Sequence, residues 1–276
     1  MLKTRILTAL VLLALFVLAA FVSRLALYAL LAFLVAGALS EWLRLSGWSW
    51  RLSILAGGTF AAAAFGLEAA GSGPAPALLR LLDLGACLAW LALTLALVRA
   101  QRGSLSMPPA LVRVLAFFLT GCAWFSLIAL LREGIVWTFS VLSIVWIADI
   151  AAYAAGRLFG RRKLASRISP GKTWEGVAGA FLAVLGLALL LRAGVHGLAI
   201  WSSRLLDADG ATGLALLGLM VAAGIVGDLF ESLVKRRAGA KDSGVLLPGH
   251  GGVWDRFDAL LPVLPLAVLV DPGQGA

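Results

Sequence analysis

The sequence is poor in charged residues, and this scarcity sets the class of protein. Only 13% of its 276 residues are charged, whereas 62% are hydrophobic and the mean hydropathy is +1.00. Soluble domains are roughly half apolar and about a quarter charged. The composition therefore excludes a soluble globular domain and predicts an all-α, polytopic integral membrane protein.

Cysteine is also scarce. The two cysteines, Cys87 and Cys122, both lie within apolar runs and form neither a CxxC pair nor a metal-ligand spacing. We expect both thiols to be buried as small hydrophobic side chains. This excludes a disulfide framework and a cysteine nucleophile.

The sequence is rich in long apolar runs. A helix needs about 20 such residues to cross roughly 30 Å of hydrocarbon. About nine runs qualify, of which the last is short. The first resembles a signal peptide, but a second apolar run follows at once, so we expect a retained first helix. The runs cover residues 6–22, 25–43, 52–69, 76–98, 110–131, 135–155, 176–192, 212–230 and 258–270.

The distribution of basic residues tests this arrangement. With nine spans and a cytoplasmic N-terminus, the cytoplasmic segments carry 18 of the 23 basic residues and the other side carries five, which obeys the positive-inside rule. Residues 227–258 and the loop after the sixth span are then predicted to face the cytoplasm. The net charge of +9 suits anionic lipid head groups there and is no evidence for nucleic acid. The five basic residues predicted to lie on the other side of the membrane are Arg24, Arg80, Arg132, Arg192 and Arg204.

The strongest concentration of charge lies between Gly227 and Asp258. Asp228, Glu231, Ser232 and Lys235 have the spacing of one helical face at the end of an apolar run. Charge at the edge of a membrane is costly, so we interpret this stretch as a functional site.

Glycine is frequent in the rest of this stretch. Residues 237–249 are predicted to form a loop that ends the helix. Gly251 and Gly252 would let the backbone approach a ligand closely, and Asp255 and Asp258 form a second acidic pair. Two acidic groups separated by a basic, glycine-rich loop suit Mg²⁺, which takes one or two carboxylates and completes its shell with water and phosphate oxygens.

The basic residues alone have a second explanation. Lys235, Arg236 and Arg237 are equally typical of a topological signal with acidic surface partners. Topology requires neither the His-Gly-Gly sequence nor two acidic pairs. The combined pattern therefore favours a site.

A second polar segment begins in the sixth apolar run. Asp149, Tyr153 and Arg157 fall on one helical face, and Asp149 lies inside the run. An intramembrane acid is either part of a site or a structural partner for a nearby base, and the sequence leaves both open.

The loop that follows contains Ser169-Pro170, Lys172 and Thr173. Proline near the first position predicts a helix start whose backbone N–H groups, with Lys172, face an anion. Plain capping combined with topological charge is the alternative.

These two segments resemble the phosphatidate cytidylyltransferase family, also called CDP-diacylglycerol synthases. The motif S-x-x-K-R-x₄-K-D-x-G-x₂-L-P-x-H-G-G-x₂-D-R-x-D runs from Ser232 to Asp258. The motif D-x₂-A-Y-x₂-G-R-x₂-G begins at Asp149, and I-S-P-x-K-T-x-E-G begins at Ile168. Gly171 departs from the pattern, since many relatives are expected to have lysine there. The resemblance implies transfer of CMP from CTP to phosphatidic acid, giving CDP-diacylglycerol and pyrophosphate.

The resemblance also implies roles for individual residues, together with Mg²⁺ and an optional second cation such as K⁺. Mg²⁺ would be held by Asp228 and Asp255, with Glu231 and Asp258 as further acids. The catalytic set would be Asp228, Asp255, Lys172, Lys241 and Arg256. The substrate-binding set would be Asp149, Tyr153, Arg157, Ser169, Thr173, Ser232, Lys235, Arg236, His250, Gly251 and Gly252. The expected partners are CTP, phosphatidic acid and membrane lipids in the inner membrane, and a homodimer is one option.

Three other functions stay open. A polyprenol or dolichol kinase shares the membrane setting but transfers the γ-phosphate. A CDP-alcohol phosphatidyltransferase would show D-G-x₂-A-R, which is absent. A transporter or scaffold would need acids along a path across the bilayer, and no strong internal repeat suggests an inverted-repeat transporter.

The N-terminal part of the chain offers little chemistry. We expect a scaffold at 1–108 and a catalytic region at 109–276. Glu41-Trp42 is interpreted as an interfacial anchor in preference to a catalytic group, and His196 as an interfacial side chain on the other face of the membrane.

Overall fold

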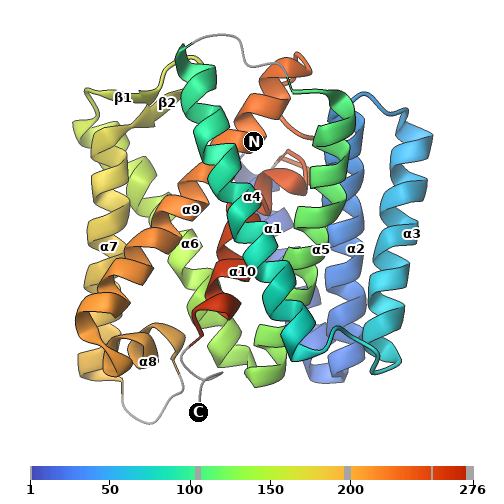
Figure 1. The fold of residues 1–276 in the computed structure, drawn as a ribbon, viewed down its shortest axis with the longest axis horizontal. Helices are drawn as coiled ribbons and strands as arrows, with labels where there is room; N and C mark the ends of the chain where they lie inside the picture. The colour runs from blue at the N-terminus through green and yellow to red at the C-terminus, as the bar shows by residue number, and fades with distance from the viewer. Residues whose placement is uncertain (1, 103–106, 196–199, 250, 272–276) are drawn as a thin grey trace. The chain divides into compact units, whose positions relative to one another are not determined.

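The computed structural model describes residues 2–102, 107–195, 200–249 and 251–271. Within these ranges the chain forms ten α-helices, one short 3-10 helix and a single two-stranded sheet (Figure 1). The predicted all-α class is confirmed. His196 and His250, both singled out from the sequence, lie outside the described residues.

Seven helices in the described ranges are long and apolar enough to cross a membrane, which makes this a multi-pass membrane protein. Two shorter apolar stretches are Leu10–Val22, within α1 (Leu2–Val22), and α10 (Leu260–Leu269). The predicted count of nine spans is therefore not confirmed. The seven are α2 (Arg24–Leu45), α3 (Trp50–Ala69), α4 (Pro76–Arg102), α5 (Pro109–Glu133), α6 (Ile135–Phe159), α7 (Trp174–Gly194) and α9 (Gly210–Arg237).

The chain packs into two compact units that interleave along the sequence. The first comprises Met1–Ala75, Ser106–Trp124 and Val234–Phe257. The second comprises Pro76–Leu105, Phe125–Leu233 and Asp258–Ala276. The functional boundary at residue 108 stays a prediction.

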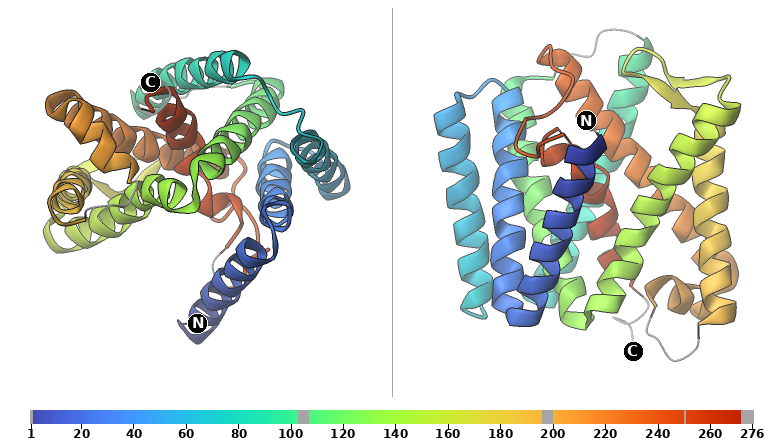
Figure 2. Two further views of the ribbon diagram at one scale, coloured as in Figure 1. Left: turned by 90° about the horizontal axis from the view of Figure 1, so that it is seen from below. Right: turned by 180° about the vertical axis from the view of Figure 1, so that it is seen from behind.

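In the first unit, α2 packs along α3, as the right-hand view of Figure 2 shows. Gly57 makes the close approach possible, because a Cβ there would lie 2.6 Å from the carbonyl oxygen of Ala36. The same unit contains the loop after α9, which leads to the 3-10 helix η1 (Trp254–Arg256). Trp42 of α2 stacks on Trp254 with ring centroids 4.5 Å apart, so η1 is seated on α2.

In the second unit, α6 and α7 run side by side (Figure 1). Small residues bring them together: a Cβ at Gly176 would lie 2.8 Å from the carbonyl oxygen of Ala152. The short helix α8 (Trp201–Ala208) lies in a segment for which the sequence suggested no helix. It packs against α6 and α7.

A β-hairpin precedes α7. Strands β1 (Lys163–Ala165) and β2 (Ser169–Thr173) pair antiparallel. The predicted helix start at Pro170 is therefore wrong, because α7 begins only at Trp174. The residue before a proline prefers an extended backbone, and Thr173 is the actual N-cap, accepting a 3.1 Å hydrogen bond from the backbone N of Gly176.

Candidate active site

Three acidic side chains meet in the second unit. Asp228 and Glu231 lie on α9, and Asp258 lies just before α10. One carboxylate oxygen from each lies within 4.8 Å of the other two. Glu231 is almost fully buried, at 1% exposure. We call these three residues the acidic cluster.

Gly227 explains how Asp258 comes so close to α9. A Cβ at position 227 would overlap the carbonyl oxygen of Asp258 and would lie 3.0 Å from the ring of Pro262. Only glycine admits the backbone of residue 258 at this distance from the helix. The cluster therefore depends on a missing side chain.

This dependence gives a prediction about two helical glycines. Gly227→Ala should lower the thermal midpoint of the detergent-purified protein, since overpacking costs about 1–3 kcal/mol. The variant should also lose most of its activity. Gly186→Ala is the matched control: a Cβ there meets nothing within 4 Å, and alanine is the better helix former. Equal midpoints and rates for the two variants would contradict the packing argument.

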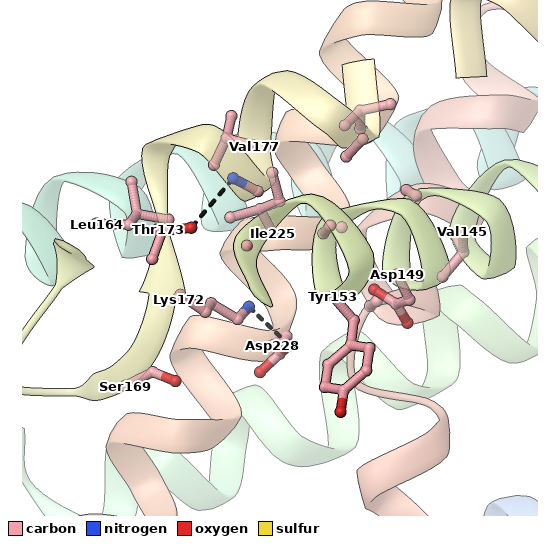
Figure 3. A pocket seen from close by; sticks show the side chains of 18 of the residues that line it. Val145, Asp149, Tyr153, Leu164, Ser169, Lys172, Thr173, Val177, Ile225 and Asp228 are labelled. Atoms are coloured by element: carbon pink, nitrogen blue, oxygen red, sulfur yellow. Dashed lines mark hydrogen bonds and ion pairs between the residues drawn. The ribbon is translucent and has the colours of Figure 1, made fainter. Parts of the chain in front are cut away.

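Lys172 supplies positive charge to the acidic cluster. Its Nζ lies 2.6 Å from Oδ2 of Asp228, as the dashed line in Figure 3 shows. Ser232 also donates a hydrogen bond to Asp228, at 3.4 Å. Removal from water and the negative charge of Asp228 raise the pKa of Asp258 to about 8. Lys172 thus faces a group of three carboxyl side chains, and converging carboxylate oxygens are ligands that a divalent cation takes.

The hairpin sets the position of Lys172. The side chain leaves β2 one residue before the N-cap of α7, and the hairpin is held to α7 by Glu175. The carboxylate of Glu175 accepts hydrogen bonds from the backbone N of Arg162 at 3.2 Å. The β-hairpin therefore fixes the lysine from outside the membrane-spanning helices.

A cavity of about 430 Å³ opens beside Lys172 and Asp228 in the second unit. Its walls are largely apolar and come from α6, α7 and α9, while polar side chains gather around Lys172 (Figure 3). Seven of the predicted site residues line it: Asp149, Tyr153, Arg157, Ser169, Lys172, Thr173 and Asp228. Arg157 donates a 3.0 Å hydrogen bond to the hydroxyl of Tyr153. The cavity suits a molecule with an apolar body and an anionic group.

The first unit holds the other acidic residue predicted to bind metal. Oδ1 of Asp255 lies 2.6 Å from Nζ of Lys235. Its Oδ2 accepts hydrogen bonds from the backbone N of Ser243 at 3.1 Å and of Gly252 at 2.8 Å. Asp255 is thus held within the loop of its own unit and is not among the three residues of the acidic cluster. Its role as a metal ligand stays a prediction.

The loop around Asp255 carries further basic residues. Lys241, Arg256 and Gly251 line a hollow of about 700 Å³ in the first unit. Arg236 donates a 3.4 Å hydrogen bond to the carbonyl oxygen of Ala240 and so braces the turn that ends α9. Gly251 has φ +87°, a backbone conformation that favours glycine.

Sequence reasoning missed the role of Glu41. The sequence predicts an interfacial anchor at Glu41, but the side chain is buried, at 1% exposure. Its Oε2 accepts hydrogen bonds from Oγ of Ser243 at 2.8 Å and from the backbone N of Trp254 at 2.9 Å. The available signal was an acid near the end of an apolar run, which is costly unless it is bound.

Comparison with known proteins gives an independent line of evidence about the family of this chain. A model of the cytidylyltransferase family matches residues 3–271. A Haemophilus influenzae protein named phosphatidate cytidylyltransferase is 46% identical over 127 residues, which cover 45% of this chain and 42% of the relative. A Pseudomonas aeruginosa protein of the same name is 45% identical over 162 residues, covering 56% of this chain and 55% of the relative. In each case the match spans about half of the relative's length.

Proposed function

Because the chain belongs to the cytidylyltransferase family, we propose that it transfers CMP from CTP to phosphatidic acid. The products would be CDP-diacylglycerol and pyrophosphate, in a step of phospholipid biosynthesis. One observation carries this proposal: Asp228 of the acidic cluster and its partner Lys172 line an apolar cavity among membrane-type helices. A lipid phosphate needs this combination, since its acyl chains favour apolar walls and its phosphate needs positive charge.

The proposed reaction joins two anions. An oxygen of the lipid phosphate attacks the α-phosphorus of CTP, and the bond to the β-phosphate oxygen breaks as pyrophosphate leaves. No nucleophilic side chain is needed, so positioning and neutralisation of charge dominate. Lys172 holds the lipid phosphate at the mouth of the cavity, with Arg157 and Tyr153 beside it.

The proposed cofactor is Mg²⁺. Asp228, Glu231 and Asp258 fit it, because one carboxyl oxygen from each lies within 4.8 Å of the others and carboxylate oxygens are the ligands that Mg²⁺ takes. Bound Mg²⁺ supplies charge neutralisation to the phosphates. A role for Asp255 toward Mg²⁺, and for a second cation such as K⁺, belongs to the same proposal.

The basic loop of the first unit completes the proposal. Lys241 and Arg256 bind phosphates of CTP, while Lys235 holds Asp255. We propose that residues 227–258 and the β-hairpin face the cytoplasmic side of the inner membrane, where CTP is available, because both segments are rich in basic residues. The proposed reaction requires no second copy of the chain. The homodimer named as an option from the sequence stays a prediction.

The proposal is tested with detergent-purified protein, phosphatidic acid, Mg²⁺ and CTP labelled at the α-phosphate. Label should enter lipid with one pyrophosphate released per transfer, and EDTA should abolish both. Label entering lipid only from γ-labelled CTP would replace the proposal with a lipid kinase. No transfer by folded protein to any of several lipid acceptors would overturn it.

A further inference from the structure

A buried glutamate of α2 contacts the signature loop. Glu41 and the loop Lys241–Arg256 both belong to the first unit, although some 200 residues separate them in sequence. Its Oε2 accepts hydrogen bonds from Oγ of Ser243 and from the backbone N of Trp254, at 2.8 and 2.9 Å. One carboxylate therefore ties down both ends of the segment between residues 243 and 254.

Two glycines of the loop make room for this carboxylate. A Cβ at Gly244 would overlap Oε1 of Glu41, and a Cβ at Gly252 would overlap Oε2 and the hydroxyl of Ser243. The space that a side chain would fill at these positions is thus taken by Glu41. Gly252 serves packing inside the protein, in addition to any approach to a ligand.

Ser243 transmits the position of Glu41 to Asp255. The hydroxyl of Ser243 donates to Glu41 and accepts a 3.3 Å hydrogen bond from the backbone N of Asp255. The backbone N of Ser243 donates to the carboxylate of Asp255, which also pairs with Lys235. Ser243 is fully buried, so no water replaces these contacts in the folded loop.

We propose that Glu41 is a positioning residue for the reaction. It holds the loop Lys241–Arg256 so that Asp255 is oriented and Lys241 and Arg256 are presented to the phosphates of the nucleotide. This inference rests on the proposed function and extends it to a residue of the N-terminal region, outside both sequence motifs.

The first test compares Glu41→Gln with Glu68→Gln. Glu68 is a buried acid on α3 of the same unit, so it controls for loss of a buried carboxylate. Glu41→Gln should lower kcat/KM for CTP by about 10–100-fold, as for residues that orient the groups of a site. The loss should fall mainly on KM for CTP and leave KM for phosphatidic acid within about twofold. Ser243→Ala should show the same selectivity, and its effect should not add fully to that of Glu41→Gln because the two side chains are in direct contact and act through the same loop.

The second test does not depend on activity. Trypsin cleavage after Lys241 should be faster in Glu41→Gln and in Ser243→Ala than in the wild type or in Glu68→Gln. If Glu41→Gln does not fold, Ser243→Ala decides both tests.

Equal behaviour of the Glu41 or Ser243 variants and the Glu68 control in kinetics and proteolysis would overturn the inference. A wild-type protein that transfers nothing from CTP overturns the proposed function instead. The proteolysis result would still report whether Glu41 holds the loop.

Discussion

Asp228→Asn should insert and fold like the wild type and lose about 10²–10³-fold in turnover, as sites do when one electrostatic contact to the reacting group is removed. Asparagine keeps the shape of the side chain but removes the charge that faces Lys172 at 2.6 Å and the other two acids of the cluster. The half-saturating Mg²⁺ concentration should rise as well. Both quantities are measured with the label-transfer assay over a series of Mg²⁺ concentrations.

The matched control is Asp209→Asn. Asp209 is exposed and lies immediately before the first residue of the same helix, α9, and asparagine is an equally good N-cap residue there. A readout besides activity is the thermal midpoint: Mg²⁺ should raise it in the wild type and in the control, because binding to the folded state stabilises it, and not in Asp228→Asn. Near-wild-type turnover in Asp228→Asn would remove this residue from the metal site.

Lys172→Gln should raise KM for phosphatidic acid more than KM for CTP and lower kcat/KM for the lipid by about 10²-fold or more. The reason is the place of Lys172 in the apolar cavity beside Tyr153 and Arg157, where the lipid phosphate is proposed to bind. Lys172→Arg should restore part of the loss, because the charge is kept. Steady-state kinetics in mixed micelles, with lipid and CTP varied separately, measures both constants.

Lys163→Gln is the control for Lys172→Gln. Lys163 is an exposed residue of β1 and pairs with Thr173 across the same hairpin, so this variant removes a positive charge without touching the cavity. A similar rise in KM for lipid in both variants would mean that the hairpin acts by general attraction of anionic lipid. In that case Lys172 would have no specific contact with the substrate.

The sequence predicted the seven long helices because hydropathy directly reports which segments suit a bilayer, and it missed the short amphipathic helix α8. The glycines after α9 predicted the end of this helix and the loop that follows. The structure agrees, because Gly239 has a positive φ of +68°, a conformation common just after a helix. The prediction failed at Pro170, where proline is compatible with a strand as well as with a first helical turn. Extended pairing with β1, together with the cap at Thr173, decided between them.

The candidate site was predictable only in part, for a similar reason. Asp228 and Glu231 could be joined because helical periodicity relates residues that are close in sequence. The contact between Glu41 and Ser243 depends on tertiary packing of segments far apart in the chain, which no local pattern encodes. Gly227 and Gly252 were visible as glycines, but the atoms that fill the space beside them were not.

The short helix α10 has a consequence for biogenesis. Its ten residues rise about 15 Å, roughly half of the hydrocarbon thickness, and nearly all of them are buried against other parts of the protein. A segment of this length is too short to cross the hydrocarbon on its own, so we expect α10 to be seated by its contacts with α4 and α6 once those helices are in the membrane. Because Asp258 lies directly before α10, completion of the acidic cluster is expected to depend on this packing. We therefore expect a nascent chain with all of its long helices inserted to lack the complete acidic cluster.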